Sequence, residues 1–189
     1  DRIISAVDMD KKEGQRNRAI LETLYSCGLR VSELCNLKLS DLYFEEGFIK
    51  VEGKGSKQRL VPISPRAIKE IKYWLTDRSL GKIKKGYEDY VFLARWGNNI
   101  SRIMVFHMIK ELAEKTGITK NISPHTFRHS FATHLLEGGA NLRAIQCMLG
   151  HESIATTEIY THIDRNMLRS EIIEHHPRNI KYRKERGIY

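Results

Sequence analysis

A histidine and an arginine lie three residues apart in the segment Ser123–His129. Pro124 favours the first turn of a helix and Ser123 is a good cap residue, so the segment is predicted to begin a helix. On that helix His125 and Arg128 share one face. Because guanidinium donors match the geometry of an oxyanion, the two side chains could hold two oxygens of one phosphate group. This heptapeptide alone leaves open a second interpretation, a solvated helix face on which the two residues have no common task.

Two further residues that could do chemistry follow Leu149. Gly150 is predicted to end one helix and Ser153 to cap the next, which places His151 in the turn at the donor-rich start of the second helix. Tyr160 lies two turns further on. A lone tyrosine on a short helix is more commonly a half-buried core residue, so Tyr160 by itself indicates no reaction.

Two cations lie close to glycines. Arg30 follows Gly28 at the predicted start of a helix, and Glu33, three residues later, can pair with it. Lys54 lies at the tip of a predicted hairpin, an exposed position suited to reaching into a groove. The surrounding Gly53–Gly55 does not indicate a nucleotide-binding loop, because it lacks the Gly-x-x-x-x-Gly-Lys-Ser/Thr spacing and joins two strands.

Three histidines on one predicted helix, His125, His129 and His134, raise the question of a zinc site. A metalloprotease helix carries His-Glu-x-x-His, and here Thr126 stands at the position of the glutamate. His134 falls on the apolar side of the helix and is interpreted as a hydrogen-bonded core histidine. No metal and no other cofactor are therefore predicted.

Helical periodicity and cap residues predict that most of the chain is helical. Phe127, Phe131 and Leu135 recur at a spacing of four residues and would anchor the helix of the first motif in the core. The predicted helices are Arg16–Cys27, Val31–Leu37, one beginning at Pro65, Ser101–Thr116, Pro124–Glu137, Leu142–Leu149, Ser153–His162 and Asp164–His175.

Two β-like runs, Gly47–Glu52 and Arg59–Ile63, surround a glycine-containing loop, which predicts a hairpin. The apolar run Tyr90–Leu93 could add a third strand. The predicted fold class is therefore mainly α with a small antiparallel β-sheet, an α+β arrangement. The segment after Pro177 is basic and lacks a clear apolar period, so we expect one domain over residues 1–177 and a basic C-terminal tail over 178–189.

The composition limits the classes of function. Of the 189 residues 41% are hydrophobic, enough for one domain with a core. Thirty-two Lys and Arg against 23 Asp and Glu give a net charge of +9, which favours a polyanionic partner such as nucleic acid. No run of about 18 apolar residues would span a membrane, and no secretory signal is visible. The scattered Cys27, Cys35 and Cys147 indicate no disulfide framework and fit a reducing cytoplasm.

Taken together, four segments resemble the boxes of the tyrosine recombinase (phage-integrase-like) family, in the same order and with the expected spacing. Each box alone is weakly specific, but the ordered set is very specific and extends from about Arg16 to Pro177. Within this family, the chain most resembles the bacterial Xer branch, whose members resolve chromosome dimers. The similar sequences are Ser130–Leu136 and Ile159–His162. The four segments are Gly28–Leu34, Val51–Pro62, His125–His129 and Leu149–His151 with Tyr160.

The resemblance implies a role for each matching residue. Tyr160 would be the nucleophile and become linked to a 3′-phosphate of DNA. Arg30 and Arg128 would bind the non-bridging oxygens, with His151 assisting. At pH 7 a tyrosine with a pKa of about 10 costs roughly 4 kcal/mol to ionise, and two arginines over the phosphate can offset this cost.

The remaining roles concern protons and partners. Lys54 would protonate the leaving 5′-oxygen, His125 would help to move the tyrosine proton, and Glu33 matches the acidic partner of the first arginine. The family needs neither metal nor ATP. The implied partners are double-stranded DNA with a recombination site and a homo- or hetero-tetramer on that DNA, formed through the segment 164–189. Relative to full-length members of the family, we expect this chain to lack the N-terminal DNA-clamping domain.

Two other functions remain as alternatives. A non-catalytic DNA-binding module of the same fold is disfavoured, because every catalytic position is filled. A type IB topoisomerase-like enzyme uses similar residues to relax DNA without exchanging strands. The cellular task, chromosome dimer resolution or integration and excision of a mobile element, is not fixed by these residues.

Overall fold

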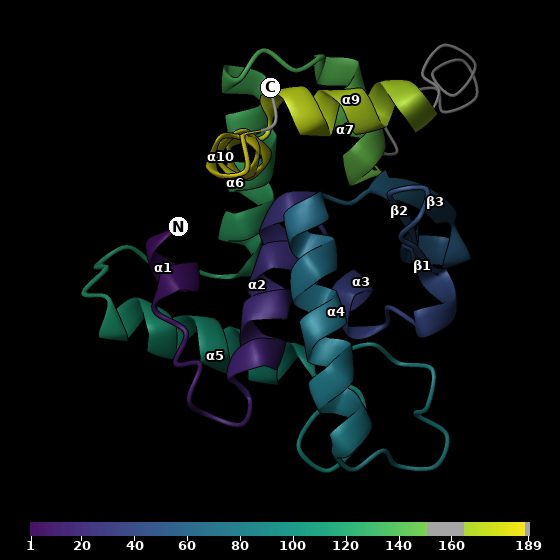
Figure 1. Ribbon diagram of the computed structural model, residues 1–189, viewed down its shortest axis with the longest axis vertical. Coiled ribbons are helices and arrows are strands. Elements are labelled where there is room, and N and C mark those ends of the chain that lie inside the picture. The colour runs from purple at the N-terminus through teal and green to yellow at the C-terminus, as the bar shows by residue number, and fades with distance from the viewer. Residues whose placement is uncertain (151–164, 188–189) are drawn as a thin grey trace.

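The computed structural model describes residues 1–150 and 165–187, and the predicted helix Ser153–His162, with His151 and Tyr160, lies outside them (Figure 1). No helix in the described part of the chain is long and apolar enough to cross a membrane. The helices are α1 Arg2–Ser5, α2 Gly14–Cys27, α3 Val31–Cys35, α4 Pro65–Leu80, α5 Arg102–Lys115, α6 Pro124–Glu137, α7 Leu142–Leu149, α9 Arg165–His175 and α10 Pro177–Glu185; the 3-10 turns are η1 Leu39–Asp41 and η2 Lys54–Ser56.

The predicted hairpin is confirmed. Strands β2, Phe48–Glu52, and β3, Gln58–Pro62, pair in antiparallel fashion with Ile49 opposite Val61. A short strand β1, Leu42–Tyr43, pairs with the other edge of β2, so the sheet has the order β1-β2-β3. The chain is therefore mostly helical with a small antiparallel sheet, as predicted.

The prediction of a third strand at Tyr90–Leu93 is wrong. Tyr90 and Leu93 each form one isolated bridge, and the third strand of the sheet is β1. The segment is held by side chains of α4: Arg78 Nε donates to the Tyr90 carbonyl at 3.0 Å and Trp74 Nε1 to the Val91 carbonyl at 2.8 Å. These carbonyls are thus satisfied outside any sheet.

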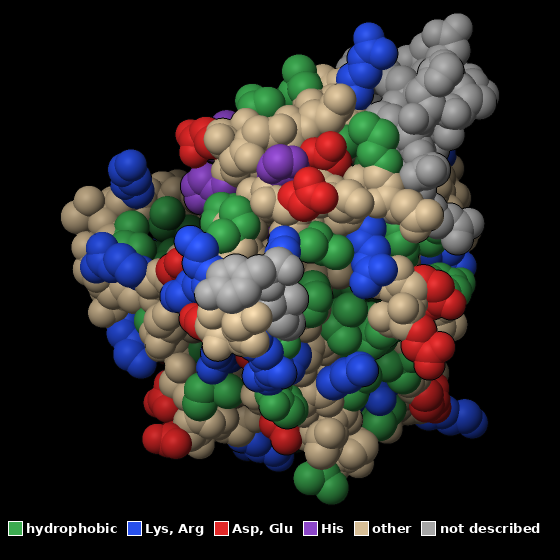
Figure 2. All heavy atoms as spheres, turned by 45° about the horizontal axis from the view of Figure 1, so that its top comes forward, with side chains coloured by type: hydrophobic (Ala, Val, Ile, Leu, Met, Phe, Trp, Pro, Cys, Tyr) green, Lys and Arg blue, Asp and Glu red, His purple; other side chains and the backbone are tan. Residues whose placement is uncertain are grey.

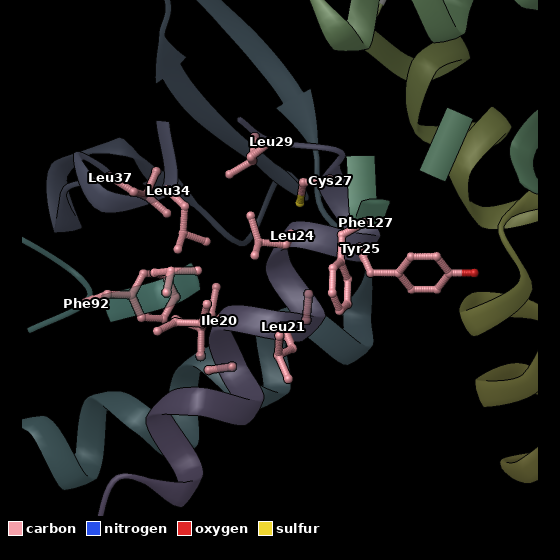
Figure 3. Packing of buried hydrophobic residues seen from close by; sticks show 14 of the residues in the cluster. Ile20, Leu21, Leu24, Tyr25, Cys27, Leu29, Leu34, Leu37, Phe92 and Phe127 are labelled. Atoms are coloured by element: carbon pink, nitrogen blue, oxygen red, sulfur yellow. The ribbon is translucent and has the colours of Figure 1, made fainter. Parts of the chain in front are cut away.

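Helix α2 is the centre of the first hydrophobic core. It packs against α4 and α6, and its Ile20, Leu21 and Leu24 are fully buried. Figure 3 shows these side chains among others from α3 and the segment around Phe92. α2 ends at Gly28, whose backbone is left-handed (φ 65°) and where a Cβ atom would lie 2.4 Å from the Phe131 ring. The chain that follows this glycine is therefore placed by the core itself.

A second core joins the C-terminal helices. Phe131 and Leu135 of α6 are buried with residues of α7 and α9, while Phe127 packs in the first core. The predicted apolar stripe on α6 is confirmed, and it links the two cores. Leu168 and Ile172 of α9 are buried in the second core of the same chain.

Helix α10 was not predicted from the sequence, because its buried residues are mainly polar. Arg178 is buried and pairs with the buried carboxylate of Glu22 on α2, and its Nη1 also lies 2.7 Å from Asp1 Oδ1. Asn179 donates to the Ile172 carbonyl at 3.1 Å. An ion pair and hydrogen bonds, which hydrophobic periodicity does not detect, thus hold the first turn of α10 on the domain.

His176, which caps α10, is fully buried. Its Nε2 lies 3.2 Å from the Tyr25 carbonyl, and its Nδ1 accepts from the Arg178 N–H at 3.2 Å. Figure 3 shows the Tyr25 ring extending away from the first core, and this ring lies edge-on to His176. Burial lowers the pKa of His176 to about 4.

We expect this histidine to make the fold sensitive to acid. Because the unfolded ring titrates near pH 6.5, the unfolded chain binds more protons between pH 6.5 and 4, and the free energy of unfolding should fall by up to about 3 kcal/mol across this range. Urea denaturation at several pH values measures it. His176→Gln should flatten this part of the profile, whereas His129→Gln, at an exposed position, should not; equal slopes in His176→Gln and the wild type would contradict the assignment.

Candidate active site

Arg30 lies directly before α3, where the first core places it. Its backbone N–H donates to Glu33 Oε1 at 2.8 Å, and its Nη1 lies 3.8 Å from Glu33 Oε2. The predicted pairing of these two residues is therefore confirmed. The Arg30 side chain is 43% exposed, whereas that of Glu33 is 1% exposed. The carboxylate is buried beneath an arginine that can still meet a ligand.

Arg59, which the sequence analysis did not select, is the main partner of Glu33. Its Nη2 donates to Glu33 Oε1 at 3.0 Å and its Nη1 to Oε2, and its Nε donates to the Met148 carbonyl at 2.9 Å. One side chain of β3 thus ties α3 to the end of α7. The alternation of side chains along β3 is the sequence signal that could have identified Arg59, since Arg59 lies on the same buried face as Val61.

These contacts set the charge of Glu33. Burial alone would raise the pKa of its carboxyl, but the hydrogen bonds and charge of Arg59, the Arg30 N–H and the charge of Arg128 outweigh it and lower the pKa. Glu33 is therefore ionised at neutral pH. A buried carboxylate that stays charged can hold arginines in fixed positions.

Arg128 joins three parts of the chain at this point. Its Nη1 donates to the Gly28 carbonyl and its Nη2 to the Leu149 carbonyl, each at 2.6 Å. Burial lowers the pKa of Arg128 to about 10. The positive charges of Arg30 and Arg59 also lower this pKa, whereas the negative charge of Glu33 raises it. The guanidinium remains protonated at neutral pH. Three arginines therefore lie close enough to influence one another around a single carboxylate.

Lys54 lies on the hairpin that carries Arg59, and His125 lies on the helix that carries Arg128. Lys54 is exposed in η2, at the tip of the hairpin whose second strand carries Arg59. His125 is exposed in the first turn of α6, three residues before Arg128 and so on the same face. In the described part of the chain, no hydrogen bond or ion pair joins either residue to Glu33 or to the arginines.

The end of α7 leads into the segment that contains His151 and Tyr160, which lie outside the described residues. Arg59 and Arg128 hold the carbonyls of its last two residues. Gly150 follows in a left-handed conformation (φ 69°), and a Cβ atom there would lie 3.1 Å from the Arg59 guanidinium. The residue before His151 is therefore packed directly on the group of arginines.

The histidines of α6 do not form a common site. His134 is partly buried and its Nδ1 lies 2.6 Å from the Tyr25 hydroxyl, which confirms it as a hydrogen-bonded core residue. Within residues 1–150 and 165–187, no three His, Cys, Asp or Glu side chains are grouped as metal ligands. The independence of metal stays a prediction.

Comparison with known proteins identifies the family. Residues 1–167 match the phage integrase family. The chain belongs to this family. Among the relatives of this phage integrase chain, the tyrosine recombinase XerD of Chlorobaculum tepidum is 50% identical over 163 residues, 86% of this chain and 54% of the relative. XerD of Pseudomonas putida is 43% identical over 176 residues, 93% of this chain and 59% of the relative.

Solved structures support the same conclusion for the fold. The XerA recombinase has a TM-score of 0.71 at 37% identity, covering 93% of this chain and 62% of that one. XerH bound to its difH substrate in a pre-cleavage complex has a TM-score of 0.70 at 30% identity, covering 86% and 48%. The phage integrase chain therefore has the fold of a tyrosine recombinase catalytic domain. It spans about half to three fifths of the length of these proteins.

We expect Arg59 to be essential for this arrangement. In Arg59→Met the Glu33 carboxylate stays buried with Arg30 as its remaining partner, and breaking such a pair destabilises by about 3–5 kcal/mol. Urea denaturation measures the loss, with the exposed neighbour Gln58→Met as the matched control.

The double variant Glu33→Gln/Arg59→Met, which leaves no buried charge from this pair, should recover part of the loss. If Arg59→Met proved as stable as Gln58→Met, the central role of Arg59 would be wrong.

Proposed function

We propose that this phage integrase chain is the catalytic part of a site-specific DNA recombinase in which Tyr160 cleaves one strand and forms a 3′-phosphotyrosine link. The observation that carries the proposal is the convergence of Arg30, Arg59 and Arg128 on the single carboxylate of Glu33. Strand exchange then follows when a 5′-hydroxyl from another strand attacks this link, so neither metal nor ATP is needed.

The charge of this group suits a phosphodiester. Three guanidinium groups against one carboxylate leave two positive charges in excess. A phosphodiester carries one negative charge and gains a second as the tyrosine oxygen attacks it, so the site is most complementary to the transition state. Arg30 is exposed enough to meet a non-bridging oxygen, and the position of Arg128 is fixed by two backbone carbonyls before DNA arrives. His151 would assist in binding the same oxygens.

We assign proton transfer to two exposed residues, one on the hairpin that carries Arg59 and one on the helix that carries Arg128. Lys54 on the hairpin tip would protonate the leaving 5′-oxygen, and its exposed position suits it to reaching into a DNA groove. His125 would take part in removing the Tyr160 proton, since it shares a helix face with Arg128. A positioned acid for the leaving group contributes about 10²–10⁴-fold to the rate.

We expect Tyr160→Phe to abolish the covalent protein–DNA adduct on a nicked suicide substrate and to leave DNA binding nearly unchanged. The phenyl ring fills the same space but has no oxygen to attack phosphorus. Denaturing gels of labelled substrate measure the adduct, and a mobility shift measures binding. An adduct that persists in Tyr160→Phe would exclude this residue as the nucleophile.

The same assay separates the alternatives. Cleavage should continue in excess EDTA and without nucleotide, whereas a loss that zinc or magnesium restores would overturn the metal-free mechanism. Recombinant products from two duplexes distinguish a recombinase from an enzyme that only relaxes supercoils. An absence of adduct in the wild type would favour a non-catalytic DNA-binding module.

The proposed substrate is double-stranded DNA with a specific recombination site, in the bacterial cytoplasm. The net charge of +9 supports a polyanionic partner, and Figure 2 shows Lys and Arg side chains spread over the face that it displays. The identity to XerD proteins favours Xer-like chromosome dimer resolution over integration or excision of a mobile element.

Assembly into a homo- or hetero-tetramer on DNA is proposed through the segment 164–189. We infer that Leu168 and Ile172 of this segment do not meet a neighbour, because both are buried within their own chain. The exposed face of α10, with Lys181 and Lys184, is left for contacts with another protomer or with DNA.

Charge reversal on this face tests the assembly. In the full-length protein, Lys181→Glu/Lys184→Glu should reduce recombination between two sites at least tenfold and leave adduct formation on a single site within twofold. Lys110→Gln on the exposed face of α5 is the control. Normal two-site recombination by the α10 variant would contradict this contact.

A further inference from the structure

A cavity of about 330 Å³ lies at the end of α2 that is remote from Arg30. In Figure 1 this is the lower end of α2 and α4, away from the β-hairpin. Because α2 has 14 residues, it separates the cavity from the candidate active site by about 21 Å. Six basic residues against Glu13 and Asp77 line the cavity: Lys11, Lys12, Arg16, Arg78, Lys82 and Arg95.

Two of these arginines are buried in the cavity wall. Arg16 is 7% exposed and Arg78 is 8% exposed. Arg16 Nη1 donates to the Leu93 carbonyl at 3.2 Å, and its Nε donates to Asn17 Oδ1 at 3.1 Å. Arg78 Nη2 donates to the Glu88 carbonyl at 2.6 Å. These acceptors are neutral, so they satisfy donors without balancing either positive charge.

The other buried arginines of the described residues have a charged partner. Arg59 and Arg178 each pair with a buried carboxylate. Within residues 1–150 and 165–187, no carboxylate oxygen lies within 4.0 Å of the Arg16 or Arg78 guanidinium. Burial lowers the pKa of Arg16 and of Arg78. The more distant charges of Glu13, for Arg16, and Asp89, for Arg78, only partly oppose this shift. A buried charge without a counterion is costly, and an anion in the cavity would remove that cost.

The rim of the cavity is a built structure. The turn Ala94–Gly97 is closed by the Gly97 N–H donating to the Ala94 carbonyl at 3.0 Å, and the Lys84 N–H donates to the Gly97 carbonyl at 3.0 Å. At Gly97 (φ 91°) a Cβ atom would lie 2.6 Å from the Lys84 backbone nitrogen, so the close approach of these two backbone segments needs glycine. The turn places Arg95 beside Lys82, with both cations over the exposed Trp96 ring at 5.4 and 6.0 Å.

We propose that this cavity binds a small organic oxyanion, a phosphate ester or a carboxylate with an apolar part. Guanidinium groups bind both kinds of oxyanion, and Trp74 and Leu93 offer apolar surface in the same wall. The volume is at the lower end of the range for small-molecule sites, about 300–1,000 Å³. A DNA duplex is too wide to reach the two buried guanidinium groups, which favours a small ligand over nucleic acid.

The two tryptophans of the chain both lie at this site, so intrinsic fluorescence reports on it directly. The fluorescence of the chain is titrated with butyl phosphate and, separately, with butyrate at constant ionic strength. At least one probe should give a saturable change, which persists in Trp96→Phe, where Trp74 alone reports. The probe that saturates distinguishes a phosphate ligand from a carboxylate ligand.

Variants then locate the binding. Arg16→Met/Arg78→Met should weaken it at least tenfold. Because both side chains also hold backbone carbonyls, a second variant at exposed rim positions, Lys12→Glu/Lys82→Glu, should weaken it at least fivefold in a folded protein. Lys110→Glu/Lys120→Glu, which makes the same change in net charge at exposed positions away from the cavity, should bind as the wild type does.

Three outcomes would overturn the proposal. The first is the absence of a saturable change with either probe. The second is unchanged affinity in Lys12→Glu/Lys82→Glu. The third is an equal loss in Lys110→Glu/Lys120→Glu, which would show that net charge and not the cavity attracts the anion. Because no arm uses DNA cleavage, failure here is independent of the proposed recombinase activity.

Discussion

The buried carboxylate of Glu33 is the interaction on which the candidate active site depends. It accepts hydrogen bonds from Arg59 and from the Arg30 backbone, and it lies 3.8 Å from the Arg30 guanidinium. Without this negative charge, Arg30, Arg59 and Arg128 would repel one another in a partly buried space. With it, the group keeps a positive excess for an anionic ligand while its geometry stays fixed. In the proposed function, the carboxylate would therefore be as much a part of phosphate recognition as the arginines.

The same group also unites the fold. Arg59 belongs to β3, Arg128 belongs to α6, and Arg30 follows the end of α2. Arg59 and Arg128 also donate hydrogen bonds to carbonyls at the end of α7. Gly28 and Gly150 are the two points where this convergence requires a left-handed backbone and a missing side chain, since Phe131 and Arg59 occupy the space that a Cβ atom would need. Packing of the core and placement of the site are thus one arrangement.

The sequence predicted the parts of the molecule whose signals are local. The bounds of α6 and α7 and the pairing of the hairpin follow from caps, apolar spacing and glycines, and Arg30 pairs with Glu33 as expected. Arg59 was missed because its importance depends on a partner 26 residues away. The run Tyr90–Leu93 resembles a strand in sequence because a buried apolar run has the same pattern when side chains of α4, and not a neighbouring strand, bond its carbonyls. Helix α10 was not predicted because its buried residues, Arg178 and Asn179, are both polar.

The buried and half-buried arginines show how one residue type serves two purposes in this chain. Where a carboxylate faces the guanidinium, as at Arg178, the charge is balanced internally and the pair fastens one helix to another. Where only carbonyls accept, as at Arg128, the side chain is equally fixed but its charge remains available to a ligand. Arg16 and Arg78 share the second pattern, although they lie at the far end of α2 from the active site. Since an uncompensated buried charge opposes folding, its retention at a cavity is better explained by a ligand than by stability.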